Sequence, residues 1–501
     1  MRSRAHNSLH PWALGLLGAF FATAGSVAVV HADSDLPDIG NPAGVILSKD
    51  DEFQIGMMIV RQLRDQNQVV EDPESTEYIE SVGGRLAAQT PDGNKHFDYF
   101  VVDDSAINAF ALPGGFIGIN YGTILVSQNE SQIAGVLAHE TAHIVQRHIA
   151  RAVRAQSRQS LATAAAILAS VLIGAAGGGS QAVEGGIAAA EGLAAQAQIN
   201  FTRDEEFEAD RVGMGFLHNA GFDPRGMPDF FETLSRRYGY EEGLIPKILM
   251  DHPVTSERIA EGRARAAQYG RPGKIQDSTS YALIRERLRV ITAPHDTDMR
   301  AYYAKRLEMR NPALSDQYGE AIAMMQRGHP TEAAEILEPL VQQHEGVILL
   351  HIALGQAQVA AGQTQDGLAT FAHAEGLFPR NTPLTVRYAE ALMKAGQNKQ
   401  AHDLLLDLFN NVEPTPSQIR LTALAASAAN DPGDAYFYMG EYQISRGNLV
   451  LASHQLELAL QTPNLTTVQR ERYKARLQEI RDFLVLQRRQ QHERESAENG
   501  G

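Results

Sequence analysis

The sequence of 501 residues contains no cysteine, and this absence removes several kinds of chemistry at once. It excludes disulfide bonds, thiolate metal sites, a cysteine nucleophile and a lipid-bearing cysteine at a mature N-terminus. Basic residues are also outnumbered, with 44 Lys and Arg against 60 Asp and Glu, so the formal net charge is −16. Because nucleic-acid-binding proteins present a basic face to phosphates, the composition argues against a nucleic-acid partner. Any metal must be held by His and carboxylates.

The first 32 residues have the organisation of a secretory signal peptide. Arg2 and Arg4 form a basic start, an apolar stretch covers 12–30, and Val30-His31-Ala32 is a small-x-small cleavage site. The alternative is an uncleaved anchor helix, which the absence of a basic flank after the segment disfavours. We therefore expect export, with cleavage after Ala32.

The region after the signal peptide predicts a mainly α-helical domain with a small β-sheet. Apolar residues recur at helical spacing from about 48 to 90, and the stretch from about 131 to 157 is strongly helical. Aromatic and β-branched residues at 97–102 predict a strand. Two short apolar runs around Pro113-Gly114-Gly115 predict a hairpin or a kinked edge strand.

Beyond about residue 310, the chain becomes a series of Ala- and Leu-rich helices with an internal repeat. Gly328, Gly362 and Gly396 lie 34 residues apart, and Gly447 follows 51 residues later, which equals 34 plus one helix of 17 residues. Small and then large apolar residues recur in the same frame: Ala333, Gly367, Ala401 and Ala452, then Leu337, Phe371, Leu405 and Leu456. This pattern resembles tetratricopeptide repeats, which have a period of 34. The alternative is a helical domain without repeats.

The decisive motif is His139-Glu140-Thr141-Ala142-His143. On a helix, residues i and i+4 share a face, so both imidazoles can reach one ion with Glu140 beside it. Zinc explains these residue types, because two neutral imidazoles and a third ligand leave one position for a water of lowered pKa. Glu140 can take the proton and pass it to the leaving amine. The motif predicts a metallopeptidase with one Zn²⁺ per chain; the alternative is a helix with two surface histidines.

A third zinc ligand is required, and no histidine follows the motif at the spacing of an extended metzincin site. His148 is one residue short and would lie on another helix face. A second helix offers Glu206 and Asp210, which share a face at i and i+4. If Glu206 binds zinc, Asp210 can accept a hydrogen bond from a ligand histidine. Glu205 and Glu208 would point into solvent, and the alternative is that the whole acidic face is solvated.

Residues 159–183 contain no charged residue and are rich in Ala and Gly, which raises the question of a transmembrane span. The two halves of the predicted zinc site flank this stretch and must meet at one ion, so a single crossing is impossible. A second crossing is disfavoured by Glu184, Glu191 and several Gln. A mobile hairpin beside the active site is the interpretation we favour.

These motifs together resemble those of the gluzincin metallopeptidases, the relatives of the membrane CAAX prenyl peptidase and of a bacterial heat-shock membrane protease. The resemblance is carried by His-Glu-Thr-Ala-His and, at 206–210, Glu-Phe-Glu-Ala-Asp, with Asn108-Ala109-Phe110 and Pro-Gly-Gly upstream. It implies the following roles: zinc ligands His139, His143 and Glu206, general base Glu140, and Asp210 as a supporting residue. It also implies that the strand with Asn108, Ala109 and Phe110 pairs with the substrate backbone.

The same resemblance draws attention to His252, in Asp251-His252-Pro253. In such proteases, a histidine-proline loop after the second helix can occupy the open zinc position and hold the enzyme inactive. Two alternatives remain open at this point. The histidine could stabilise the oxyanion of the tetrahedral intermediate, or it could be an ordinary solvated loop residue.

The sequence thus predicts a zincin-type metallopeptidase domain at 33–270, connecting helices at 271–310, a tetratricopeptide-repeat solenoid at 311–486 and a polar tail at 487–501. The resemblance to the exported, repeat-bearing members implies a periplasmic zinc endopeptidase that degrades misassembled or unfolded envelope proteins and has a chaperone-like role in outer-membrane protein assembly. Expected partners are these proteins and the outer-membrane barrel assembly machinery, and peripheral membrane association is left open. The alternative function is a repeat-based binding scaffold or chaperone with a silent or structural metal site.

Overall fold

The computed structural model describes residues 48–91, 93, 97–156, 202–238, 248, 252–270 and 277–499. The chain divides into two compact units, 1–41 and 42–501, and every described residue belongs to the second. The predicted signal peptide and the uncharged stretch at 159–183 lie outside the described residues. Within the described ranges, no helix combines the length and the apolar character that a membrane span requires.

Two helices and a small sheet begin the described chain: α1 (Lys49–Asp65), α2 (Pro73–Ala87), β1 (Asp98–Val102), β2 (Ala109–Ala111) and β3 (Phe116–Asn120). The strand order is β1-β3-β2, with β1 parallel and β2 antiparallel to β3. The turn between β2 and β3 places Gly114 at φ 81°, where a side chain would be strained and its Cβ would meet the backbone of Phe53. The predicted strand and hairpin are confirmed, and β2 is an edge strand.

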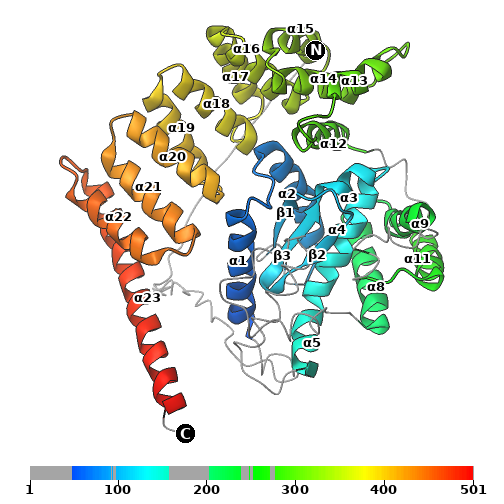
Figure 1. The fold of residues 1–501 in the computed structure, drawn as a ribbon, viewed down its shortest axis with the longest axis horizontal. Helices are drawn as coiled ribbons and strands as arrows, with labels where there is room; N and C mark the ends of the chain where they lie inside the picture. The colour runs from blue at the N-terminus through cyan, green and yellow to red at the C-terminus, as the bar shows by residue number, and fades with distance from the viewer. Residues whose placement is uncertain are drawn as a thin grey trace, which may run out of the picture. The chain divides into compact units, whose positions relative to one another are not determined.

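The predicted helical stretch near 131–157 consists of two helices, α4 (Glu130–Val145) and α5 (His148–Gln156). Arg147 lies between them with a left-handed φ of 52°, which interrupts the helix. Four more helices surround this part of the fold: α3 (Tyr121–Val126), α8 (Arg203–Asn219), α9 (Gly226–Tyr238) and α11 (Ser256–Gln268). Every residue from 130 to 143 in α4 is buried, and α4 contacts α2, α8, α9 and the sheet (Figure 1).

The C-terminal half is entirely helical among its described residues. After α12 (Thr279–Ile291) and α13 (Met299–Leu307), successive helices pack against one another (Figure 1). They are α14 (Leu314–Gln326), α15 (Pro330–Gln343), α16 (Ile348–Ala360), α17 (Thr364–Leu377), α18 (Thr382–Lys394), α19 (Asn398–Phe409), α20 (Pro416–Ala428), α21 (Pro432–Ser445), α22 (Leu449–Gln461) and α23 (Thr467–Asn499). The segment predicted as a polar tail therefore continues α23 as far as Asn499.

The repeat is more regular than the sequence indicated. The first helices of successive pairs begin at 314, 348, 382 and 416, and the second helices at 330, 364, 398 and 432, so both series advance by 34 residues. The prediction of one additional 17-residue helix before Gly447 is therefore wrong. Asn430, with φ 61°, replaces the expected glycine after α20, because asparagine also tolerates the left-handed conformation that ends a helix. Gly447 instead follows α21, the second helix of its pair.

The peptidase part and the repeats share one hydrophobic core and several buried ion pairs. A single cluster of buried side chains extends from α2, α4 and the sheet through α12 into α14–α16. Arg387 of α18 lies 2.9 Å from Glu74 and 3.2 Å from Asp72 at the start of α2. Arg61 of α1 donates hydrogen bonds to the carbonyl oxygens of Ile444 and Ser445 near the end of α21. Repeats and peptidase part are thus in direct contact.

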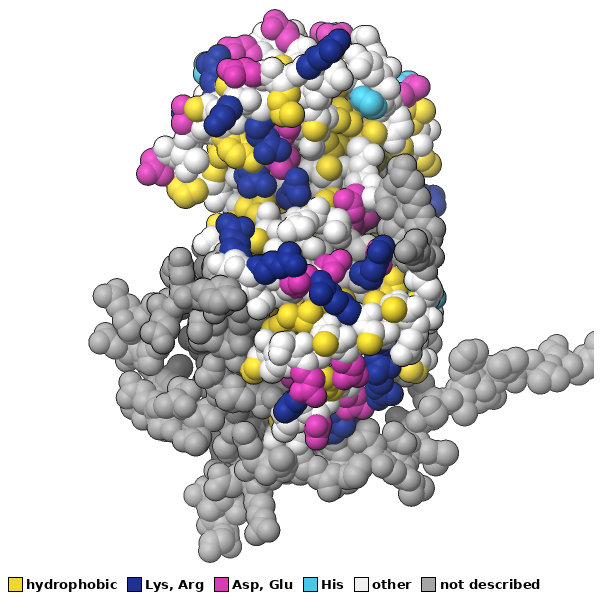
Figure 2. Space-filling view, turned by 90° about the vertical axis from the view of Figure 1, so that its right-hand side faces the viewer, with side chains coloured by type: hydrophobic (Ala, Val, Ile, Leu, Met, Phe, Trp, Pro, Cys, Tyr) yellow, Lys and Arg dark blue, Asp and Glu magenta, His cyan; other side chains and the backbone are white. Residues whose placement is uncertain are grey.

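Charged side chains of both signs are interspersed on the face shown in Figure 2. Ion pairs on α9 and α11 illustrate this mixture: Glu232 pairs with Arg236 and Arg263, and Glu261 with Arg265. This face therefore shows no large patch of one sign, although the chain carries a formal net charge of −16.

Candidate active site

Helix α4 presents both histidines of the motif on one buried face. The helix begins at the N-cap Asn129, whose side chain accepts a hydrogen bond from the backbone of Gln132. His139 and His143 are four residues apart and both buried, and their Nε2 atoms lie 3.0 Å apart. Two imidazole nitrogens that converge at this distance are arranged to share one proton or one metal ion.

Helix α8 brings two carboxylates to the same place. Its start is fixed by a capping box between Thr202 and Glu205, which leaves Glu206 and Asp210 on the inward face. The two Glu206 oxygens lie 3.5 Å from His139 Nε2 and 3.5 Å from His143 Nε2. Asp210 Oδ1 lies 2.9 Å from His139 Nδ1, the other nitrogen of that ring. The two helices therefore place the four residues in the relation that the i, i+4 spacings predicted.

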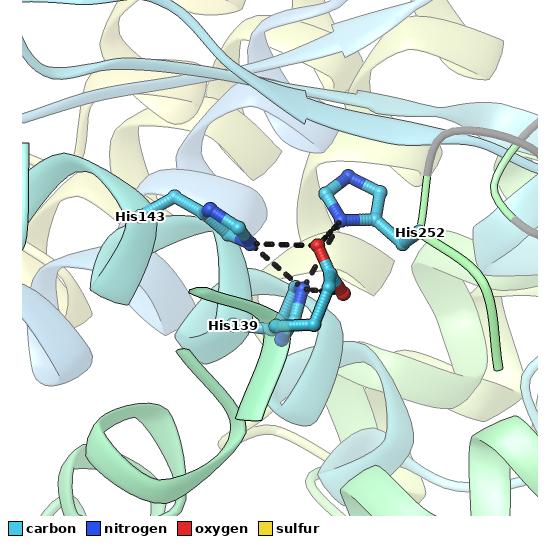
Figure 3. A group of neighbouring side chains, drawn as sticks. His139, His143 and His252 are labelled. Carbon is cyan, nitrogen blue, oxygen red and sulfur yellow. Dashed lines mark hydrogen bonds and ion pairs between the residues drawn. The ribbon is translucent and has the colours of Figure 1, made fainter. Parts of the chain in front are cut away.

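His252 completes the cluster from the segment before α11 (Figure 3). Its Nδ1 lies 2.8 Å from Glu206 Oε1 and 3.3 Å from His139 Nε2. The side chain is buried, so the alternative of a solvated loop histidine is wrong. Its backbone NH donates to the carbonyl of Ile248, whose own NH donates to the carbonyl of Ile107, one residue before Asn108. The His252 segment is thus linked by backbone hydrogen bonds to the start of the predicted substrate strand.

Glu140 is buried beside this cluster, and neither of its carboxylate oxygens has a hydrogen-bond partner among the described residues. Its Oε1 lies 3.6 Å from His252 Nε2. A buried carboxylate without hydrogen bonds costs free energy, and such exceptions call for an explanation in function. A water molecule or a substrate group in the site would supply the missing donors.

The electrostatics of the cluster favour a bound cation. Burial alone would lower the pKa of His139, but hydrogen bonding with Asp210 and Glu206 outweighs it and raises the pKa to about 10. Burial raises the pKa of Glu206, yet His252 and His139 hold it well below its usual range. His143 has a lowered pKa, first because of burial and then because of the neighbouring His139 and His252. The carboxylates are therefore ionised, and the buried site attracts positive charge.

The ligand atoms of His139, His143, Glu206 and His252 lie within 4.8 Å of one another, as a metal site requires. Two or three neutral imidazoles with a carboxylate are a donor set that divalent transition metals prefer. The residues present therefore fit a metal ion.

Arg258 is a site residue that the sequence analysis missed. It lies in α11, is buried, and donates to Asp210 from Nε (2.7 Å) and Nη2 (2.8 Å). Its Nη1 lies 2.6 Å from Glu206 Oε2 and donates to the carbonyl of Pro253. Arg258 thus ties both carboxylates of α8 to the His252 segment. Its position six residues after His252 carried no recognisable signal, because the chain contains many other arginines.

Two further predictions near the motif need correction. His148 was expected on another helix face, but its Nδ1 lies 2.8 Å from Nδ1 of His143, because α4 ends at Val145 before that face is reached. Glu208 was expected in solvent, but its Oε2 contacts His148 Nε2 at 3.1 Å and accepts a hydrogen bond from Arg151. Both side chains belong to the surroundings of the site.

The predicted substrate strand lies close to α4. Ala109 and Phe110 belong to the edge strand β2, which contacts α4, and Asn108 immediately precedes it. The Asn108 side chain is buried, and neither its oxygen nor its nitrogen has a hydrogen-bond partner among the described residues. Its backbone, in contrast, is held by the hydroxyl of Thr123. An unpaired buried amide at the start of an edge strand is suited to bind a peptide backbone.

Comparison with known proteins agrees with this geometry. The family model of peptidase family M48 matches residues 73–266, and a tetratricopeptide-repeat model matches 358–424. The beta-barrel assembly-enhancing protease of Escherichia coli K12 is 33% identical over 470 residues, which cover 92% of this chain and 94% of that protein. The protein of the same name from Yersinia pestis is 30% identical, with 93% and 96% covered. The mitochondrial metalloendopeptidase OMA1 of Schizosaccharomyces pombe is 31% identical over 188 residues, covering 37% of this chain and 51% of that protein.

Fold and site together define a metalloendopeptidase whose catalytic domain is followed by tetratricopeptide repeats. The predicted fold class is confirmed. The chain belongs to the beta-barrel assembly-enhancing proteases of peptidase family M48. Membership of this family implies a bound metal ion.

Proposed function

We propose that this chain is a zinc endopeptidase that acts on unfolded or misassembled envelope proteins. The observation that carries the proposal is the buried Glu140, which lies with unpaired oxygens beside a converging set of imidazole and carboxylate ligands. His139, His143 and Glu206 would hold one Zn²⁺. Ligand atoms that share a tetrahedral zinc at about 2.0–2.1 Å are separated by roughly 3.4 Å, close to the 3.0–3.5 Å found here.

The proposed chemistry divides the work among named residues. When bound, zinc acts as a Lewis acid and lowers the pKa of a nearby water molecule toward neutrality. Glu140 takes the proton from the attacking water and delivers it to the leaving amine. Asp210 accepts a hydrogen bond from His139 Nδ1 and thereby fixes its tautomer, while Arg258 holds Asp210 and Glu206 in place.

The substrate would bind as an additional strand along β2. Backbone pairing accepts many sequences, as an enzyme that recognises unfolded chains requires. The Asn108 amide would donate to or accept from the substrate backbone next to the reacting peptide bond, which would satisfy its unpaired atoms. Ala109 and Phe110 would supply the edge itself.

The biological setting follows from the relatives and the first residues of the sequence. The relatives are named for beta-barrel assembly, and we propose the same setting here: export to the periplasm after cleavage at Ala32, and action on outer-membrane proteins that fail to assemble. The repeats at 311–486 would bind the client or the barrel assembly machinery and give the protein a chaperone-like role. Residues 33–270 would form the peptidase domain, and 271–310 would connect the two.

The deciding experiment is a casein-cleavage assay of the zinc-loaded protein, comparing wild type with Glu140→Gln. We expect the variant to retain zinc and to lose activity by at least about 10²–10⁴-fold, the usual contribution of a general base. Asp204→Asn, an exposed acidic residue on α8, is the matched control and should leave activity unchanged. Equal activity, or equal inactivity despite bound zinc, would contradict the proposal and favour a binding scaffold with a silent metal site.

A further inference from the structure

His148 makes two contacts on opposite sides of its ring, and neither belongs to the chemistry described above. Its Nδ1 lies 2.8 Å from His143 Nδ1, and its Nε2 lies 3.1 Å from Glu208 Oε2. We propose that His148 and Glu208 act as positioning residues that fix the ring and the tautomer of His143, so that its Nε2 faces the metal with a lone pair. The inference rests on the proposed function, because His143 is one of the proposed ligands.

The local backbone explains how His148 reaches this position. In an unbroken helix, a residue five places after His143 would lie roughly 140° further around the axis and could not contact its ring. Here α4 ends at Val145, Arg147 adopts φ 52°, and α5 begins at His148 itself. The change of direction brings the ring centroids within 4.8 Å, with the planes at 81°. His148 has no exposed surface, so the contact is enclosed by protein.

The order of donors and acceptors along this chain follows from the chemistry of its ends. The Glu208 carboxylate can only accept, so His148 carries its proton on Nε2. The Nδ1 of a neutral imidazole with that proton is an acceptor, and it therefore receives a hydrogen bond from His143 Nδ1–H. His143 then has no proton on Nε2, the atom that lies 3.0 Å from His139 Nε2. Arg151, three residues after His148 on α5, donates to Glu208 at 2.9 Å and holds the carboxylate in place.

Both histidines of α4 are then oriented by a carboxylate from α8. For His139 the carboxylate is Asp210, at 2.9 Å from Nδ1. For His143 it is Glu208, which is too far from the ring for direct contact and acts through His148. Histidine ligands of metals nearly always donate their second nitrogen to such a partner, and removal of the partner weakens metal binding by about 10–100-fold.

Zinc affinity of the full chain, measured by competition with a chromogenic chelator, tests the inference. Leucine and asparagine have similar size, but only asparagine offers an oxygen near the position of Nδ1. We therefore expect His148→Leu to bind zinc about 10–100-fold more weakly and His148→Asn to remain within about 3-fold of wild type. Glu208→Gln should weaken zinc binding less than His148→Leu, because the amide oxygen can still accept from His148. Asp204→Asn on the same helix is the control and should change nothing.

A second measurement separates positioning from packing. In the zinc-free protein, the ¹⁵N shifts of His143 should report a proton on Nδ1 in wild type and His148→Asn, and a mixture of tautomers in His148→Leu. Equal zinc affinity in wild type and His148→Leu, or an equal loss in the Leu and Asn variants, would overturn the inference. Wild type that binds no zinc would contradict the proposed function itself, and this result is read before any variant is compared.

Discussion

At the scale of single residues, His252 decides whether the site is open to water. Its Nδ1 lies among the proposed ligand atoms, 2.8 Å from Glu206 Oε1, and its Nε2 faces Glu140 at 3.6 Å. A fourth protein ligand on a zinc ion excludes the water that a catalytic site must keep, so this arrangement is that of a closed site. Arg258, which contacts Pro253 and both α8 carboxylates, holds the segment in this closed position.

We therefore predict that His252→Ala raises the basal rate of peptide cleavage. Removing the imidazole leaves a space beside Glu206 that water can enter, while His139 and His143 continue to hold the metal. Turnover of a generic fluorogenic peptide and zinc content, measured together, check this expectation. His218→Ala, an exposed histidine on α8, serves as the control. A fall in turnover with zinc still bound would instead assign His252 to stabilisation of the oxyanion.

At the scale of elements, the site depends on how closely α4 and α8 approach each other. At Gly213 of α8, a Cβ would lie 2.7 Å from the carbonyl oxygen of Ala138 and 3.1 Å from the backbone nitrogen of His139. The two helices are therefore in backbone contact one residue before the first histidine of the motif. Any side chain at 213 would push Glu206 and Asp210 away from the histidines.

Gly213→Ala should consequently reduce both stability and zinc affinity. Overpacking of this kind costs about 1–3 kcal/mol, and here the obstacle is backbone, which cannot rotate away. Gly215→Ala is the matched control on the same helix, because its Cβ would meet only the hydroxyl of Tyr269 at 3.7 Å. That substitution should be neutral or stabilising by up to about 1 kcal/mol, since alanine favours helix. Thermal unfolding and chelator competition on both variants check the prediction, which fails if the two behave alike.

The elements also show what the sequence could and could not predict. The motif on α4, the Glu206–Asp210 pair and the 34-residue period follow from helical spacing, which is a local property, so these predictions needed no tertiary information. Arg258 and the contact between His148 and Glu208 depend on how helices meet and on a break at Arg147, and no periodicity encodes these. Asn430 was missed because only glycine was sought at the helix ends.

At the scale of the described molecule, peptidase and repeats are joined by buried charge. Asp72 and Glu74 at the start of α2 face Arg287 of α12 and Arg387 of α18. Burial by itself would raise the pKa of Asp72, but the two arginines lower it well below its usual range, so this carboxylate is charged. Burial raises the pKa of Glu74. The repeats therefore supply, through Arg387, part of the charge that the peptidase part needs in order to bury these two groups.

This arrangement predicts that Arg387→Met destabilises the whole chain and not the repeats alone. Removal of one member of a buried ion pair costs up to about 3–5 kcal/mol, because the remaining carboxylate stays buried without its partner. Arg380→Met is the control, since its pair with Asp407 is mostly exposed and should contribute at most about 1 kcal/mol. Chemical denaturation followed by circular dichroism at pH 7.5 gives the difference. As the pH falls, Glu74 takes up its proton first because its pKa is raised, so the penalty should shrink toward that of the control. Equal stability of the two variants at pH 7.5 would show that the hydrophobic core alone joins the repeats to the peptidase part.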